Sequence, residues 1–341
     1  MSTHPTPAKK TALITGATGF IGQHLVRYLL DQNFMVRALV RNTESDFIKQ
    51  YPQVEWKRGD LTQLHSLLNL CEGVDHVFHL AGFAHASGDG SAEFDSMHEQ
   101  INFQGTINLL SEVVKAEAKV KVRSFVFLSS VKAGSDSSHC IDETSPESRE
   151  SPSTVYGLAK RKAEQNVLKI CEENNISGVV LRPALVYGVG MKGNLRMMLH
   201  SIEKKRFPPL PSYPNKRSLI SAQDLCRAAV LASNAENLSQ RIFIVTDGMI
   251  YSTAEIESLM RLALGQKKPT WHLPLWAFRV LALAGDLGEK VLRKPLPMST
   301  KIFNKLFGNA WYQSKYIQAE LKFVPEYSLG KILPEIIKEK V

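Results

Sequence analysis

The chain has 341 residues, 44% of them hydrophobic, which is enough to bury the core of one large or two modest domains. Its longest apolar runs fall short of the roughly 20 residues that span a bilayer, and the first ten residues lack the apolar segment of a signal peptide. The formal net charge is +9, but the basic residues form only modest clusters without a recognition motif, so no nucleic-acid partner is expected.

Neither the cysteines nor the N-terminal residues are predicted to form a functional site. The four cysteines are far apart and show no metal-ligand spacing, so we expect free thiols, no metal site and a cytoplasmic protein. Residues 1–10 are predicted to form a flexible tail before the first strand. The cysteines are Cys71, Cys140, Cys171 and Cys226.

The first half of the chain alternates apolar, β-rich runs with helical patterns. Such alternation indicates βαβ units, so the predicted fold class is α/β, with a doubly wound, Rossmann-type parallel sheet. Strands are predicted at 11–15, 35–40, 54–59, 76–82, 124–130 and 178–183. Helices are predicted at 20–32, 62–71, 93–118 and 154–174, with a helical stretch between the strands at 35–40 and 54–59 and a polar loop at 134–153.

Beyond residue 183 the alternation loosens. A strand is predicted at 241–247, and a helix at 252–264 begins with a capping-box pattern. We therefore predict a dinucleotide-binding domain over 11–183 and a smaller, mostly helical substrate-binding region over 184–341, with sheet-completing elements near 215–247. The apolar segment 272–294, which has a basic end, is expected to be a buried helix; the alternatives are a cap over a greasy substrate or a helix resting on a membrane surface.

The stretch "TGATGFIG" (15–22) follows the first predicted strand and opens the first helix. Gly16, Gly19 and Gly22 suit a sharp turn that lets a pyrophosphate approach the backbone at a helix N-terminus, where the helix dipole favours anions. The strand–turn–helix context predicts dinucleotide binding. The alternative is a glycine-rich turn that serves packing only.

The end of the second predicted strand decides between NAD and NADP. An acidic residue there would bind the ribose 2′-hydroxyl of NAD, whereas this chain has Arg37 and Arg41 and no acid before Glu44. We predict that Arg41 binds the 2′-phosphate, which favours NADP over NAD; the alternative is a solvated strand-end arginine. Asp60, after the third predicted strand, is a candidate to bind the adenine amino group or to cap a helix.

Ser129 and Ser130 end a predicted strand, and "YGLAK" (156–160) begins the helix after the polar loop. Because ligands of doubly wound sheets lie at the carboxyl ends of strands, these residues are expected to converge. The Lys160 ammonium would favour the phenolate of Tyr156 and lower its pKa from about 10, which suits proton transfer. With Ser130 holding the reacting oxygen and a nicotinamide carrying the hydride, the set predicts alcohol–ketone chemistry.

At this point the sequence resembles the extended short-chain dehydrogenase/reductase family, in its NAD-dependent epimerase/dehydratase branch. The matching motifs are "TGATGFIG", "GDL", "HLAG", "INFQGTINLL", "FVFLSSVKAGS", "YGLAK" and "LRPALVYG". The resemblance implies an NAD(P)-dependent oxidoreductase with catalytic Ser130, Tyr156 and Lys160, in which Lys160 also contacts the nicotinamide ribose. Asn102 matches an asparagine of the family's "N-x-x-G-T" helix, with a helix-surface amide as the alternative. Further cofactor contacts are expected at Thr18, Phe20, Ile21, Leu61, Leu80, Ala81 and Gly82.

The resemblance also implies a substrate class. "RSLISAQDL" aligns with a segment in which an arginine binds the diphosphate of a sugar nucleotide, which gives Arg217 that role. "RPALVYGVGMKGN" resembles bacterial enzymes that epimerise C4 of UDP-N-acetylhexosamines or reduce UDP-4-keto-6-deoxyhexosamines, with Asn194 at the diphosphate or at a helix cap. Arg182 stands where UDP-galactose 4-epimerases have an asparagine, so its substrate contact is expected to differ.

Dehydratases of this branch carry an acidic pair directly after the position of Ser130, where this chain has Val131 and Lys132. Dehydration is therefore not expected, and the predicted activity is 4-keto reduction or 4-epimerisation of a UDP-sugar, with NADP favouring reduction. The alternative enzyme is a sterol-type or flavonoid-type oxidoreductase; a non-catalytic dinucleotide sensor is disfavoured by the intact Ser–Tyr–Lys set. The family resemblance implies a homodimer.

Overall fold

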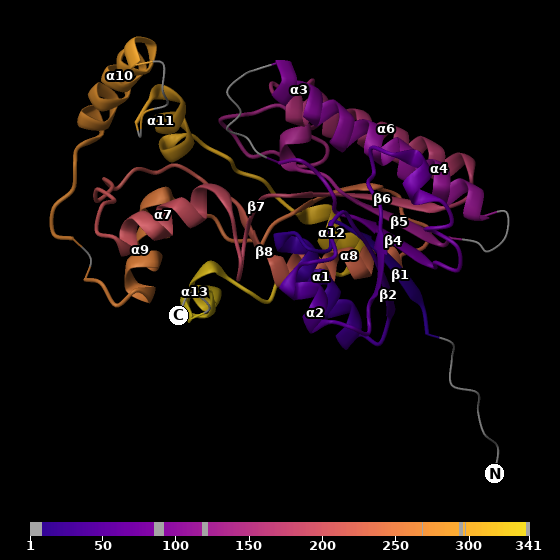
Figure 1. Cartoon of the computed structure of the whole chain (residues 1–341). Coiled ribbons are helices and arrows are strands. Elements are labelled where there is room, and N and C mark those ends of the chain that lie inside the picture. The colour runs from indigo at the N-terminus through magenta and orange to yellow at the C-terminus, as the bar shows by residue number, and fades with distance from the viewer. Residues whose placement is uncertain are drawn as a thin grey trace.

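The computed structural model describes residues 9–84, 92–117, 122–267, 269–292, 296 and 298–338. A seven-stranded sheet, parallel throughout, forms its centre, with the strand order β3-β2-β1-β4-β5-β6-β9 (Figure 1). The order reverses between β1 and β4, as in doubly wound sheets, so the predicted fold class is confirmed. The strands are β1 (Thr11–Thr15), β2 (Met35–Val40), β3 (Glu55–Arg58), β4 (His76–His79), β5 (Ser124–Leu128), β6 (Ser177–Pro183) and β9 (Ile242–Val245).

Helices cover both faces of this sheet. On one face α1 (Phe20–Asp31) packs beside α8 (Ala222–Ser233), and on the other α4 (Gly105–Glu117) packs beside α6 (Val155–Glu173) (Figure 1). The central strands are buried on both sides, so they read as continuous apolar runs, yet successive residues still face opposite layers. In β1, for example, Ile14 packs into the core under α1 and Leu13 into the core under α4.

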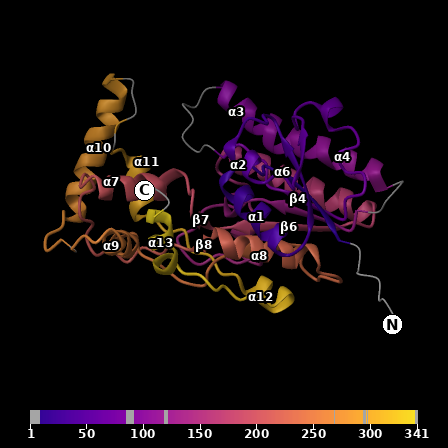
Figure 2. The ribbon, with the colours of Figure 1, turned by 60° about the horizontal axis from the view of Figure 1, so that its bottom comes forward.

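After β6 the chain leaves the sheet and builds a second region. β7 (Leu185–Tyr187) pairs in parallel with β8 (Leu219–Ser221), and α7 (Gly193–Glu203) lies between them in sequence. The chain then returns to the sheet through α8 and β9, which places the second region beside the carboxyl ends of the strands (Figures 1 and 2). The remaining helices are α9 (Thr253–Ala263), α10 (Leu275–Leu292), α11 (Thr300–Phe307), α12 (Lys315–Leu321) and α13 (Leu329–Lys338).

Local side-chain chemistry overrides one predicted helix. Over 62–71 the structure has only a 3₁₀ turn, η1 (Leu64–Leu67), so the helix prediction there was wrong. The hydroxyl of Ser66 donates to the carbonyl oxygens of Asp60 and Gln63, and Asn69 adopts a left-handed conformation. Both features compete with continuing an α-helix. The helical stretch predicted between the second and third strands is α2 (Asp46–Gln50), whereas α5 (Pro146–Arg149), in the polar loop, was not predicted.

The predicted helix over 93–118 is confirmed as far as residue 117, but it is not uniform. It consists of α3 (Ala92–His98), a π-helical segment η2 (Glu99–Gln104) and α4. π-helical turns are rare and occur mostly at functional sites. This one carries Asn102, whose side chain is fully buried, so the alternative of a helix-surface amide was wrong.

The segment 272–294 forms α10, described to Leu292, and its expected burial was wrong. Five of its large apolar side chains are between 57% and 74% exposed: Trp276, Val280, Leu283, Leu287 and Val291. None of the described helices is long and apolar enough to cross a membrane. The predicted tail lies mostly outside the described residues, which begin at residue 9. All four cysteines are free thiols, as expected.

Candidate active site

The glycine turn after β1 packs too closely for any side chain. A Cβ added at Gly22 would lie 2.0 Å from the Gly16 carbonyl oxygen, and Gly16 itself has a φ of +76°, which favours glycine. Gly19 caps α1 without a side-chain hydrogen bond, and the first turn of α1 holds no acidic residue. The N-terminus of α1 therefore keeps free N–H groups and a positive dipole end, which fits the pyrophosphate of a dinucleotide.

Gly22→Ala should therefore weaken cofactor binding and lower stability, because its methyl group would push the turn away from α1. We expect the Kd for the dinucleotide, measured by isothermal titration calorimetry, to rise at least tenfold. The matched control is Gly330→Ala in α13, where an added Cβ meets only ordinary contact at 3.5 Å. That variant should bind the dinucleotide normally; equal binding by Gly22→Ala would contradict the role given to the turn.

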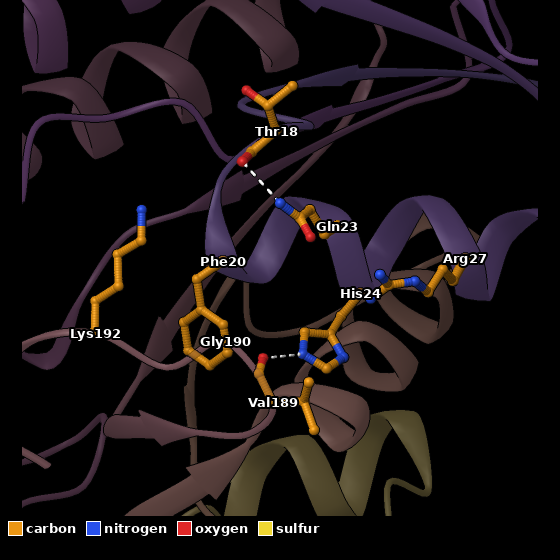
Figure 3. Close-up of a pocket in the computed structure, with 8 residues that line it drawn as sticks. All are labelled: Thr18, Phe20, Gln23, His24, Arg27, Val189, Gly190 and Lys192. Carbon is orange, nitrogen blue, oxygen red and sulfur yellow. Dashed lines mark hydrogen bonds between the residues drawn. The ribbon is translucent and has the colours of Figure 1, made fainter. Parts of the chain in front are cut away.

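A small pocket lies between the start of α1 and the loop after β7 (Figure 3). Its volume is about 80 Å³, far below that of a typical small-molecule site. His24 of α1 bonds the Val189 carbonyl oxygen at 2.8 Å, which ties this loop to the helix. Thr18 and Phe20 at the start of α1 and Lys192 of the loop also line this pocket, so the loop lies against the start of α1 (Figure 3).

The ends of β2 and β3 hold the residues predicted to select the cofactor. Arg37 is committed to structure: its guanidinium pairs with Glu55 at 2.7 Å and donates to the carbonyl oxygens of residues 70 and 72. Arg41, directly after β2, is exposed. Asp60 accepts from the backbone N–H and the hydroxyl of Thr62, so it organises a turn rather than capping a helix.

Ser130 and Tyr156 come together because α6 begins against the turn that follows β5. Gly157 allows this approach, since a Cβ there would lie only 2.2 Å from the Lys132 carbonyl oxygen. The Ser130 hydroxyl hydrogen-bonds the Tyr156 phenol and also accepts from the Lys132 N–H. Lys160, one helical turn after Tyr156, is buried and donates to the Leu128 carbonyl oxygen at 3.0 Å.

Electrostatics at this site differ from the expectation. Burial raises the pKa of Tyr156 to about 12; the Ser130 hydrogen bond opposes this rise, and the Glu164 carboxylate adds to it. Burial also lowers the pKa of Lys160 to about 8, against the attraction of Glu164. The expected lowering of the Tyr156 pKa by Lys160 is therefore not seen, because desolvation dominates and the ammonium is directed to the Leu128 carbonyl. With a pKa of about 12, Tyr156 is a protonated phenol at neutral pH.

The order of these motifs matches a known family. The model of the NAD dependent epimerase/dehydratase family covers residues 12–245. The chain belongs to this family. It is thus an NAD-dependent oxidoreductase or epimerase of the extended short-chain dehydrogenase/reductase type, as the sequence predicted.

Individual members of the epimerase/dehydratase family show the range of similarity. The chain is 30% identical to a UDP-glucose 4-epimerase of Vibrio cholerae over 275 residues, covering 80% of this chain and 81% of the relative. It is 28% identical to dihydroflavonol 4-reductase of Callistephus chinensis, covering 77% and 74% of the two chains. The solved UDP-glucose 4-epimerase of Thermotoga maritima, with UDP-glucose, superposes with a TM-score of 0.74 at 19% identity, covering 97% of this chain and 99% of that one. This structural similarity supports the fold.

A buried polar chain runs from the end of β1 to η2, which packs against α6. The His79 ring lies between the hydroxyls of Thr15 and Thr106, at 2.6 and 2.8 Å, and Thr106 donates to the Asn102 carbonyl oxygen. The Asn102 amide in turn pairs with both backbone groups of Phe83. Burial and the charge of Lys160 lower the pKa of His79 to about 3, so it is neutral at physiological pH. The chain fixes the end of β4, where Gly82 lies beside Lys160 and Asn102.

Arg182 is not at a ligand-accessible surface. It is 2% exposed and forms a two-pronged ion pair with Glu164 at 2.8 and 2.6 Å, while its third nitrogen donates to Ser148. Glu164 also accepts from Ser129 at 2.5 Å. The predicted substrate contact of Arg182 is therefore wrong. All three guanidinium nitrogens already bind Glu164 or Ser148, which connects β6 to α6 and to the polar loop.

Two side chains that contact or act on the predicted site residues were missed in the sequence. Glu164 lies four and eight residues after Lys160 and Tyr156, on the same face of α6, and this spacing could have identified it. His98 is nearly buried, and its ring meets the Tyr156 ring edge-on at 5.7 Å. Nothing in the sequence pattern singles out His98, because its neighbourhood arises from the packing of η2 against α6.

Two of the predicted substrate residues, Asn194 and Arg217, lie on the second region. Asn194 is exposed in the first turn of α7, where Lys192 rather than Asn194 occupies the N-cap. The Arg217 guanidinium donates to the Lys305 carbonyl oxygen at α11. Asp136, which pairs with Lys132, also acts electrostatically on Arg217. Arg217 therefore lies near the turn that follows Ser130.

Glu143, in the polar loop, gives a pH-dependent stability. Its carboxyl is 5% exposed and accepts from the Ile244 N–H at 2.7 Å, and burial raises its pKa from 4.5 to about 7. The unfolded chain loses this proton first, so stability is expected to fall by about 2–3 kcal/mol as the pH rises from about 4.5 to above 7. Glu143→Gln should remove that part of the pH dependence. Urea unfolding at pH 5 and pH 8 measures it; identical pH profiles of variant and parent would contradict the assignment.

Proposed function

We propose that this enzyme performs hydride-transfer chemistry at C4 of a UDP-sugar, as a 4-keto reductase or a 4-epimerase. The convergence of Ser130, Tyr156 and Lys160 beside the glycine turn carries the proposal. A bound nicotinamide would supply or accept the hydride, and the residues of the glycine turn, together with Gly82 and Lys160, would hold it. The similarity to a UDP-glucose 4-epimerase over four-fifths of both chains supports the substrate class.

We assign the binding of the reacting oxygen of the substrate, and proton transfer to and from it, to side chains of this chain. In this proposal Ser130 holds the reacting carbonyl or hydroxyl oxygen by a hydrogen bond; the hydrogen bond of its hydroxyl to the Tyr156 phenol supports this role. Tyr156 donates a proton to that oxygen during reduction and removes one during oxidation. The Lys160 ammonium stabilises negative charge that develops nearby, and burial strengthens this effect.

Dehydration is absent from the proposal because the residues after Ser130 are an apolar and a basic side chain. The two positions directly after Ser130 are Val131 and Lys132, neither of which is a carboxylate. Lys132 forms an ion pair with Asp136. Eliminating water would need an acid–base pair at those positions. For the diphosphate of the substrate we propose Arg217, with Asn194 as a second contact, since a guanidinium binds phosphate oxygens in two-pronged fashion.

We propose NADP as the preferred cofactor, bound through Arg41. Arg37 is already paired, whereas Arg41 is exposed directly after β2. Arg41→Glu should lower the ratio of kcat/KM for NADPH to that for NADH by about tenfold or more, because a carboxylate repels the 2′-phosphate. Lys49→Glu in α2 makes the same charge change and should leave the ratio unaltered. An unchanged ratio in Arg41→Glu would exclude the 2′-phosphate contact.

The test is mass spectrometry of the full chain incubated with UDP-sugars and UDP-4-keto-sugars, with and without NADPH. A product formed only with NADPH identifies a reductase, and isomerisation without added NADPH identifies an epimerase. Conversion of none of these sugars would contradict the proposal.

The second candidate is a flavonoid-type or sterol-type ketone reductase. The similarity to dihydroflavonol 4-reductase and the apolar exposed α10 favour it. Its distinguishing result is NADPH oxidation with a dihydroflavonol or a 3-ketosteroid and no UDP binding in the calorimeter.

A further inference from the structure

The outer face of α10 is an unbroken apolar stripe. Its members recur at intervals of four, three, four and four residues, which aligns them along one side of a helix. All five are more than half exposed. We call them the α10 stripe: Trp276, Val280, Leu283, Leu287 and Val291.

The opposite side of α10 already has its partner. Phe278 and Ala282 are buried, and the Phe278 ring packs on Phe307 of α11 at 5.2 Å. A Cβ added at Gly285 would lie 1.6 Å from the Met298 carbonyl oxygen, so the helix contacts this chain backbone to backbone. α10 stands at the outer edge of the second region, with α11 beside it (Figures 1 and 2). The stripe is therefore not the core of this chain.

The charges around α10 are strongly one-sided. The segment from Lys267 to Lys305 contains eight lysines and arginines but only two acidic residues, against 42 and 33 in the whole chain. Both acids are engaged on the α11 side: Asp286 accepts from Thr300, and Glu289 accepts from the backbone of residue 296. Arg279, whose guanidinium lies 6.0 Å from the centre of the Phe303 ring, and Lys301 of α11 are both exposed. The segment that carries the stripe is thus strongly net positive.

We infer that the α10 stripe binds the surface of an anionic lipid bilayer, with the helix lying in the interface. An apolar helix face flanked by basic residues gains from burying its side chains among acyl chains and from attraction to anionic headgroups. Trp276 belongs to the stripe and Trp271 is exposed just before α10, and tryptophan is enriched at the level of the headgroups. A second copy of this chain is a poorer occupant, because its own α10 would bring the same positive charge.

Flotation of the full chain with lipid vesicles tests this inference. The protein should float with vesicles containing phosphatidylglycerol and remain at the bottom with pure phosphatidylcholine. Raising the salt concentration should weaken the binding, since exposed charges are screened. Leu283→Glu with Leu287→Glu should raise the lipid concentration needed for half-maximal binding about tenfold or more.

The matched control is Leu68→Glu with Val324→Glu, which adds the same charge at two other exposed apolar positions, 64% and 65% exposed. It should bind vesicles like the parent, and circular dichroism should show both double variants folded. No flotation with phosphatidylglycerol, or equal flotation by both double variants, would overturn the inference. So would a dimer, seen by light scattering, that the stripe variant alone dissociates, because the stripe would then be a contact between copies.

Discussion

Tyr156→Phe is expected to lower kcat by about 10²- to 10⁴-fold, which is the range of general acid–base catalysis. The substitution removes only the phenolic oxygen that Ser130 contacts, and it leaves the ring that meets His98 edge-on. Cofactor binding, measured by calorimetry, should therefore persist.

Tyr316→Phe in α12 makes the same chemical change at a ring that packs against the core under α1 and α8. This variant should retain parental activity. If Tyr156→Phe kept more than about a tenth of the parental kcat, the proton would have to come from another group, and the role proposed for Tyr156 would fail.

Breaking the buried ion pair between Arg182 and Glu164 should cost about 3–5 kcal/mol of unfolding free energy, because either single substitution leaves an uncompensated charge in the interior. Both side chains are nearly inaccessible to water, at 3% and 1% exposure. Urea unfolding of Arg182→Met and of Glu164→Leu at pH 7 measures the loss.

The double variant Arg182→Met with Glu164→Leu should be more stable than either single variant, since it buries no charge. Lys49→Met breaks the exposed pair with Asp46 and should cost less than about 1 kcal/mol. Losses that simply add in the double variant would show that the two side chains do not act as a pair.

Sequence patterns predicted the parts of this molecule that depend on local chemistry. The glycine turn, the helix from Tyr156 onward and the strand predicted over 124–130 are each determined by nearby residues. The structure has all three, with the strand, β5, ending at Leu128. The catalytic assignment of Ser130, Tyr156 and Lys160 stays a prediction, which the geometry supports.

What the sequence did not predict depends on contacts between distant segments. From the sequence, Arg182 was predicted to contact the substrate. The structure shows that its guanidinium binds Glu164 and Ser148, which are distant in the sequence. The pKa of Tyr156 is set by how deeply α6 is packed, which no spacing reveals. α10 has the composition of a core helix, and only the folded chain shows that one of its two apolar sides lacks cover among the described residues.

The most direct test of the proposed chemistry follows the transfer of deuterium from C4 of the nicotinamide to C4 of the sugar. A UDP-4-keto-sugar is incubated with NADPH that carries deuterium on one face of nicotinamide C4, and then with NADPH labelled on the other face. The mass of each product is measured by mass spectrometry. For an epimerase, a UDP-sugar labelled at its own C4 is isomerised in unlabelled water. We expect one face of NADPH to add a single deuterium at C4, or the labelled sugar to keep its deuterium through isomerisation. A product that carries solvent hydrogen at C4 instead would contradict hydride transfer at that carbon.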